Sequence, residues 1–127
     1  MRPNQNNTLS GIQPPLPMNL TLAVRKTTGT PLYLVDSGCH PQTIAVVRTR
    51  AWARGIEIRV GDPAEFQFGP EVIGCLVQYP SSDGGLHDFR PLTARAHQAG
   101  ALVTAATDLL ALTVLTPPGE WGADLAV

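Results

Sequence analysis

Charged side chains are scarce in this sequence of 127 residues. Asp, Glu, Lys and Arg together make up 15% of the chain, against about 25% in typical soluble domains. Nine basic residues face ten acidic ones, so the net charge is -1. Without a basic excess, binding of nucleic acid or of an anionic membrane through bulk electrostatics is not expected. The low charge is also a first indication of an interface, or of a piece of something larger.

Long apolar runs are also missing. No stretch of about 18 consecutive apolar residues occurs, so no transmembrane helix is predicted. The first 17 residues are polar, with four prolines and three asparagines, and lack the apolar core of a secretory signal. We therefore expect residues 1–17 to be a disordered or unrelated tail. Residues 18–127 form the predicted domain, and the cytoplasm is the default location.

Cysteine, histidine and lysine are few. Cys39 and Cys75 are not in a C-x-x-C pair and lie in or beside apolar runs, so both are expected to be buried free thiols. A nucleophilic thiol at Cys39 is the alternative.

No two of the three histidines have metal-ligand spacing, so no metal site is predicted. No G-x-S-x-G elbow and no P-loop is present. The single lysine is Lys26.

Hydrophobic periodicity then predicts the elements. Expected helices begin near Met18, at Pro41 and near Phe89, and each ends at a glycine. A short helix capped by Asp108 should run to about Thr113. Expected strands cover residues 32–35, 56–60, 72–77 and 101–106, and a further strand begins near Asp124.

Strands that alternate with helices at this spacing are typical of right-handed βαβ units. The predicted fold class is therefore α/β, with a mainly parallel sheet and flanking helices. The last strand pattern reaches Val127, where a parallel sheet would be left with an unpaired apolar edge. We therefore expect a partial domain, truncated at its C-terminus.

Ligands of open α/β sheets bind beyond the carboxyl ends of the strands. Residues 36–40, 78–87 and 104–108 would gather there and would bring together one histidine, several small residues and several carboxylates. This arrangement suits a cofactor site, although any α/β domain places polar loops at that edge.

Four polar residues, the first three from these segments, also have simpler interpretations. Asp36 and Asp83 are expected to be loop carboxylates that make local turns. His87 is followed by an aspartate, but adjacent residues rarely present their side chains to each other, so this pair is taken as a helix entry. His97 follows Thr93 by one helical turn and is expected to be a surface residue.

Several runs of the sequence resemble one known family. They are Cys39 to Ala51 (CHPQTIAVVRTRA), Gln78-Tyr79-Pro80 with its glycine-containing loop, Asp108 to Leu112 (DLLAL) and Pro117 to Asp124 (PPGEWGAD). In order and spacing these runs resemble the glycine cleavage system P protein, glycine dehydrogenase (decarboxylating). The resemblance extends from about Met18 to Val127 and specifically involves the N-terminal half, or subunit 1, of that family.

The resemblance implies an incomplete part of the large domain of a fold-type-I pyridoxal-phosphate-dependent transferase. The complete enzyme decarboxylates glycine with pyridoxal phosphate and passes the aminomethyl group to the lipoylated H protein. The protein supplies the Schiff-base lysine, phosphate donors and a partner for the pyridinium nitrogen. The N-terminal half does not carry that lysine, so the implied partners are the Lys-bearing catalytic half and H protein. No catalytic residue is predicted here, and the chain alone is expected to be inactive.

His40 and Asp108 are the two candidates for contact with the cofactor. Decarboxylases of this fold stack a histidine on the cofactor ring at the position of His40. This residue could instead cap or shield the start of the helix that begins at Pro41, and without a lysine we favour that structural role. In this fold the aspartate that pairs with the pyridinium nitrogen precedes a small-small pair. Here Thr104 precedes Ala105-Ala106, and a neutral hydroxyl cannot hold the pyridinium proton as a carboxylate does. Asp108 lies beyond the pair, and a helix cap suits it better.

Three functional hypotheses remain. The chain is a structural, partner-binding part of the glycine decarboxylase. Alternatively, it is a stand-alone α/β module that binds a ligand or protein, which would require its sheet edge to be covered. The third hypothesis is a truncated product without function.

Overall fold

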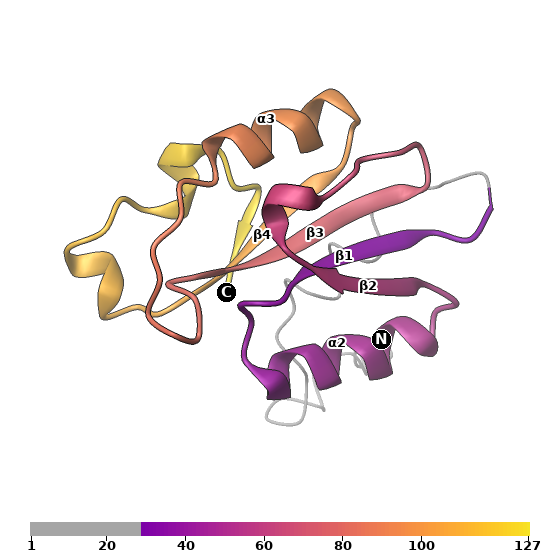
Figure 1. Ribbon diagram of the computed structural model, residues 1–127, viewed down its shortest axis with the longest axis horizontal. Coiled ribbons are helices and arrows are strands. Elements are labelled where there is room, and N and C mark those ends of the chain that lie inside the picture. Colours follow the sequence, from indigo (N-terminus) through magenta and orange to yellow (C-terminus); the bar gives the residue numbers. More distant parts are fainter. Residues whose placement is uncertain (1–28) are drawn as a thin grey trace, which may run out of the picture.

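The computed structural model describes residues 29–127. The tail predicted for residues 1–17 and the helix predicted from Met18 lie outside the described residues. Five strands form one sheet, in the order β2-β1-β3-β4-β5, and every neighbouring pair is parallel (Figure 1). The strands are β1 (Leu32–Asp36), β2 (Glu57–Gly61), β3 (Val72–Tyr79), β4 (Leu102–Thr107) and β5 (Leu125–Ala126).

Two α-helices cover opposite faces of this sheet, α2 (Pro41–Trp52) and α3 (Arg90–Gln98). Three short 3-10 helices complete the described elements: η2 (Pro63–Glu65), η3 (Ala111–Thr113) and η4 (Pro118–Trp121). The predicted parallel α/β fold and its strand positions are thus confirmed. The helix predicted from Asp108 is in fact the single 3-10 turn η3.

The buried residues form two clusters, one on each face of the sheet. On the α2 side, Tyr33 and Val35 of β1 pack with Val47 and Ala51 of the helix. On the α3 side, the alternate β1 residues join a larger cluster that includes Leu92 and Ala96 of α3. This division follows from the strand period of two, which sends successive side chains to opposite faces.

Strand β3 is the centre of the fold. All eight of its residues are buried, as its continuous apolar run predicts for a strand covered on both faces. In contrast, β2 lies at an edge and alternates exposed with half-buried residues. Among the described residues, no helix is long and apolar enough to span a membrane.

Candidate functional site

A cleft of about 700 Å³ opens at the carboxyl edge of the sheet. Chain connections explain its position, because the crossover after β1 passes over one face and the crossover after β3 over the other. Such a switch point leaves a crevice between the diverging loops. The loops after β1, β2 and β3 line the cleft together with the first turns of α3: residues 36–38, 62–64, 81–83, 87–89, 91, 92 and 95.

Asp36 anchors the base of the cleft. Its side chain is 3% exposed. Oδ1 accepts a hydrogen bond from the Gly38 N–H at 2.6 Å, and Oδ2 accepts one from the Gln78 N–H at 3.1 Å. The predicted local turn at Asp36 is therefore present, but the carboxylate also joins β1 to β3. The backbone of Ser82 adds a second link by donating to the carbonyl of Gly38 at 2.8 Å.

The loop after β3 is held by Asp83. This carboxylate accepts hydrogen bonds from the hydroxyl of Ser81 and from the N–H of Gly85. The Ser81 hydroxyl, followed by the Gly85 N–H, holds the pKa of Asp83 below its ordinary value, because both hydrogen bonds favour the charged form. The turn predicted for Asp83 is confirmed.

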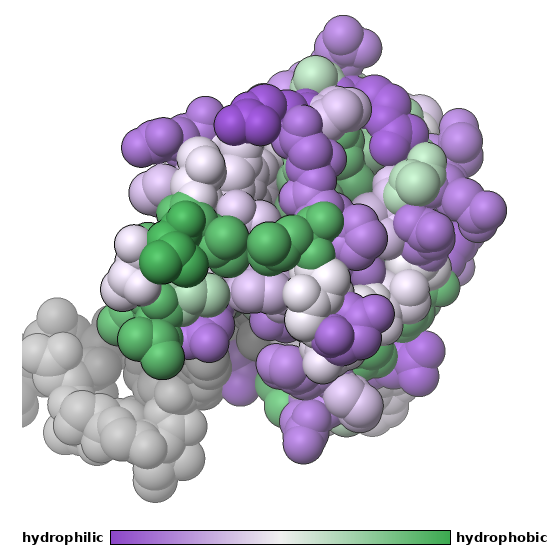
Figure 2. All heavy atoms as spheres, turned by 60° about the vertical axis from the view of Figure 1, so that its left-hand side comes forward, coloured by the Kyte–Doolittle hydropathy of each residue, from purple (hydrophilic) through white to green (hydrophobic). Residues whose placement is uncertain are grey.

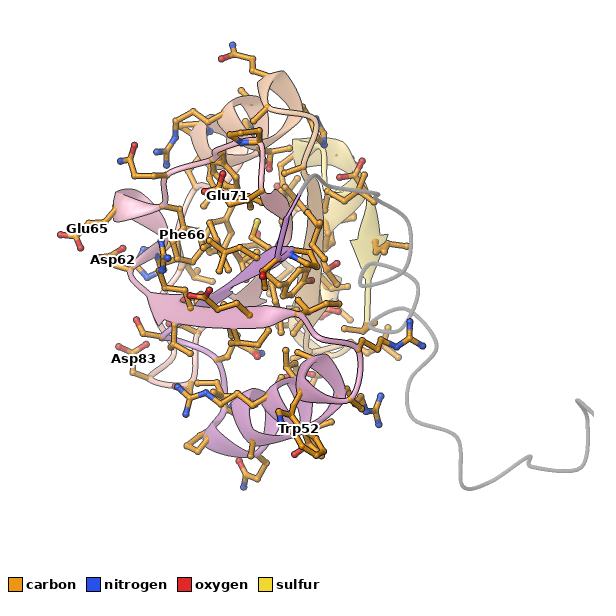
Figure 3. The ribbon with its side chains drawn as sticks, turned by 90° about the vertical axis from the view of Figure 1, so that its right-hand side faces the viewer. Trp52, Asp62, Glu65, Phe66, Glu71 and Asp83 are labelled. Atoms are coloured by element: carbon orange, nitrogen blue, oxygen red, sulfur yellow. The ribbon has the colours of Figure 1, made fainter. Side chains whose placement is uncertain are left out.

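Two charged residues of the cleft, Asp62 and Arg95, were not among the sequence candidates. Asp62 follows β2 and accepts a hydrogen bond from Ala64 N–H at 2.8 Å; Figure 3 shows it on the same side of the molecule as Asp83. The rule that ligands bind beyond the carboxyl ends of parallel strands also applies to β2, so Asp62 could have been predicted from the sequence. Arg95 of α3 is different. It donates to the carbonyls of Phe66 and Pro63, at 3.0 and 3.3 Å, and no local pattern indicates these contacts.

The two cofactor candidates, His40 and Asp108, do not line this cleft. His40 is exposed at the N-cap of α2. Its side chain makes no capping hydrogen bond, so the side-chain cap expected for it is wrong. Asp108 is exposed after β4, where Oδ1 accepts from the Leu110 N–H at 2.9 Å. Of the three segments expected at the carboxyl edge, the first two therefore share the cleft, and the segment at 104–108 does not contribute to it.

The other histidines have different surroundings. His87 lies beside the ring of Phe89, with 6.0 Å between ring centroids, while Asp88 bonds instead to Arg90. Asp88 therefore pairs with Arg90 and not with the adjacent His87, as expected. His97 was expected to be an ordinary surface residue, but its Nε2 lies 2.8 Å from Oδ2 of Asp124. Spacing along the sequence could not show this pair, because the two residues are 27 positions apart and are brought together by the packing of α3 against the sheet.

Both cysteines are buried and free, as predicted. Burial, followed by the nearby Asp36 carboxylate, raises the pKa of the Cys39 thiol to about 12. Burial likewise raises the pKa of Cys75. A nucleophilic cysteine needs a lowered pKa, so the alternative role for Cys39 is not supported. Among the described residues, no group of three or more His, Cys, Asp or Glu is placed to hold a metal ion.

The described residues do not fit pyridoxal phosphate on their own. The only lysine of the chain, Lys26, lies outside them. Thr104 precedes the Ala105-Ala106 pair, where the fold's aspartate is expected, but a threonine has no carboxylate to hold the pyridinium nitrogen. Its side chain is fully buried, with the hydroxyl 3.4 Å from that of Tyr33. Phosphate needs donors, but the cleft is lined by four aspartates, at positions 36, 62, 83 and 88. The Arg95 guanidinium already donates to two backbone carbonyls.

Sequence comparison identifies relatives for most of the chain. The family model described as "Glycine cleavage system P-protein" matches residues 17–127. The mitochondrial glycine dehydrogenase (decarboxylating) of Dictyostelium discoideum is 53% identical over 110 residues, which is 87% of this chain and 11% of the relative. The glycine dehydrogenase (decarboxylating) of Bordetella avium is 54% identical over 109 residues, 85% of this chain and again 11% of the relative. The chain therefore spans about a tenth of the length of these curated relatives.

Solved structures agree with this relationship. The crystal structure of the glycine decarboxylase (P-protein) of the glycine cleavage system, in inhibitor-bound form, matches with a TM-score of 0.74 and 39% identity, over 87% of this chain and 26% of that one. A methionine gamma lyase, CalE6 of Micromonospora echinospora, matches with a TM-score of 0.69 at 20% identity, over 87% of this chain and 31% of that one. The second match supports the fold alone, as part of a fold-type-I transferase domain. The chain belongs to the glycine cleavage system P-protein family.

Proposed function

We propose that this chain supplies a structural part of the glycine decarboxylase and acts only together with the rest of a P-protein. The complete enzyme would decarboxylate glycine with pyridoxal phosphate and pass the aminomethyl group to the lipoylated H protein. The observation that carries the proposal is the composition of the cleft: it has the position of an α/β ligand site, yet it is lined by four carboxylates and has no described lysine.

Within this proposal the chain belongs to the N-terminal half of the P-protein and packs against the Lys-bearing half. The Asp36 and Asp83 hydrogen bonds then keep the loops at the carboxyl edge in a fixed shape for that contact. His40 and Asp108 are both exposed, so they are free to contact the cofactor or the other half in the complete enzyme. Localisation in the cytoplasm is part of the same proposal.

A chimeric P-protein tests this function. In it, the 110 matched residues of this chain replace their counterparts in the D. discoideum glycine dehydrogenase, and release of carbon dioxide from carboxyl-labelled glycine is measured with H protein present. We expect the chimera to stay within about tenfold of its parent, because 53% identity preserves the fold. The 127-residue chain alone should release none. A folded but inactive chimera, or decarboxylation by the chain alone, would contradict the proposal.

Cofactor binding gives a second test. The chain and an equimolar amount of pyridoxal phosphate are treated with borohydride, and the peptide that contains Lys26 is examined by mass spectrometry. We expect no stoichiometric pyridoxyl group, since the described cleft offers no lysine and is lined by four carboxylates. The parent D. discoideum enzyme, treated in parallel, serves as the positive control. Stoichiometric labelling of Lys26 would show that the chain forms a cofactor site by itself.

A further inference from the structure

Helix α2 and the turn after it are basic. Residues 37–56 include Arg48, Arg50 and Arg54 but no aspartate or glutamate, so all ten acidic residues of the chain lie elsewhere. Arg48 and Arg54 are exposed, and Arg50 is half-buried. No ion pair joins any of these three side chains to a described residue. The positive charge of α2 is therefore not compensated within the described part of the chain.

A tryptophan accompanies these arginines. Trp52 is 84% exposed, and Figure 3 shows its side chain on α2, away from the sheet. Arg48 precedes it by four positions, so the two lie on the same side of the helix. Arg54 follows in the turn that is closed by a hydrogen bond from the Gly55 N–H to the Trp52 carbonyl, at 3.1 Å. We call Arg48, Trp52 and Arg54 the α2 patch.

The composition of the α2 patch suits a partner that binds and leaves. Permanent interfaces are rich in apolar side chains and resemble a protein core. Figure 2 shows apolar side chains gathered elsewhere, on the face at the carboxyl edge of the sheet, whereas the α2 patch has one aromatic side chain between two unpaired charges. Interfaces of non-obligate complexes are no more apolar than the rest of a protein surface, and they are enriched in tryptophan and arginine.

The charge of the patch defines the chemistry of that partner. A guanidinium group binds carboxylates and phosphates. The chain as a whole has a net charge of -1, so it does not attract nucleic acid over a distance. Two arginines beside a tryptophan instead suit a protein surface that presents carboxylates around an apolar hollow. Complementary charges of this kind speed association without making a complex permanent.

We propose that the α2 patch is a docking surface for the lipoylated H protein, which presents carboxylates to Arg48 and Arg54 and receives Trp52 between them. This inference rests on the proposed function and adds the contact surface to it. In that function, the H protein is the partner that approaches from solution and leaves with the aminomethyl group, whereas the Lys-bearing half stays bound.

Charge reversal tests the inference in the chimeric P-protein. One variant carries Arg48→Glu and its matched control carries Arg59→Glu, since Arg59 is also exposed and both substitutions change the charge equally. Arg59 projects from the other face of the sheet, because its neighbours Ile58 and Val60 pack with the cluster on the α2 side. Release of carbon dioxide from carboxyl-labelled glycine, measured at increasing H protein concentration, gives kcat and the KM for H protein.

We expect Arg48→Glu to raise the KM for H protein by about fivefold or more and to leave kcat within about twofold, because docking is weakened and the chemistry is not. Arg59→Glu should change that KM by less than about twofold. Trp52→Ala removes the aromatic side chain and should raise the KM as Arg48→Glu does. Added salt should raise the KM of the parent chimera more than that of Arg48→Glu, since screening weakens a charged contact.

Equal effects of the two charge reversals would overturn the inference, because they would report only on net charge. An unchanged KM in both Arg48→Glu and Trp52→Ala would overturn it too, as would a loss confined to kcat, which indicates a structural role. Binding of single-stranded DNA in preference to H protein would assign the patch to nucleic acid instead.

Direct binding of H protein to the same chimera separates this inference from the proposed function. A chimera that binds H protein through Arg48 but releases no carbon dioxide would support the docking surface and contradict the proposed function. An active chimera whose Arg48→Glu variant binds H protein as the parent does would refute only the docking surface.

Discussion

The carboxylate of Asp36, at the end of β1, accepts a hydrogen bond from the backbone N–H of Gln78 in β3, 42 residues further along the chain. Its second oxygen accepts from Gly38 in the loop that follows. One buried side chain therefore fixes both a strand pair and the start of the cleft. We therefore expect the geometry of the carboxyl edge to depend on this residue more than on the exposed carboxylates around it.

Replacing Asp36 by alanine should destabilise the chain by about 2 to 3 kcal/mol, because two N–H donors lose a charged acceptor in a buried place. Urea unfolding followed by circular dichroism measures the change. Asp62→Ala is the control: Asp62 lines the same cleft and also accepts from the residue two positions on, but it is exposed, so its loss should cost under about 1 kcal/mol. Equal costs for the two variants would show that the Gln78 contact contributes nothing.

Gly122 should not tolerate a side chain. Its φ is 99°, in the left-handed region, and an added Cβ would lie 3.0 Å from Cγ2 of buried Thr93. Gly122→Ala should therefore reduce the unfolding free energy by about 1 to 3 kcal/mol. Gly119→Ala, three residues earlier, meets nothing within 4 Å and should change it by less than about 0.5 kcal/mol. Thermal unfolding of both variants measures the difference. A Gly122→Ala variant as stable as the parent would show that the added side chain causes no strain.

Asp124 should matter more than its partner His97. Oδ2 of Asp124 accepts from the backbone N–H of Val103 as well as contacting His97, each at 2.8 Å. Asp124→Ala should cost about 1 to 2 kcal/mol because it leaves a backbone donor without its acceptor. His97→Ala removes only a partly exposed pair and should cost less than about 1 kcal/mol. Denaturant titration distinguishes them; a larger loss from His97→Ala would reverse this ranking.

The Cys39 thiol should be inert in the folded chain. A pKa raised to about 12, from an ordinary 9.0, leaves roughly a thousandfold less thiolate at pH 8 than an unperturbed thiol has. Ellman's reagent should therefore react much more slowly in buffer than in urea. A pKa raised by folding also means that stability is fully present below pH 9 and falls as the pH rises from 9 toward 12. Fast labelling in buffer, or constant stability across that interval, would contradict the burial of Cys39.

Local patterns were sufficient for the elements of the fold. Strand β3 was predictable because its apolar run is continuous, and α2 because Pro41 and Gly55 delimit a run with helical spacing. Parallel pairing followed from the alternation of strands and helices, since a parallel connection needs a crossover. The turn predicted as a helix from Asp108 was shorter in the structure, because only residues 111–113 adopt 3-10 geometry.

The site depended on contacts that no local pattern encodes. The sequence by itself determined the family, the parallel α/β fold, the turns at Asp36 and Asp83 and the burial of both thiols. Tertiary structure decided which loops share the cleft, the bonds from Arg95 to the η2 segment and the pairing of His97 with Asp124. Hydrophobic periodicity reports only on neighbours within a few residues. Strand order and register bring together residues far apart in the chain, and these are fixed by the packing of the whole sheet.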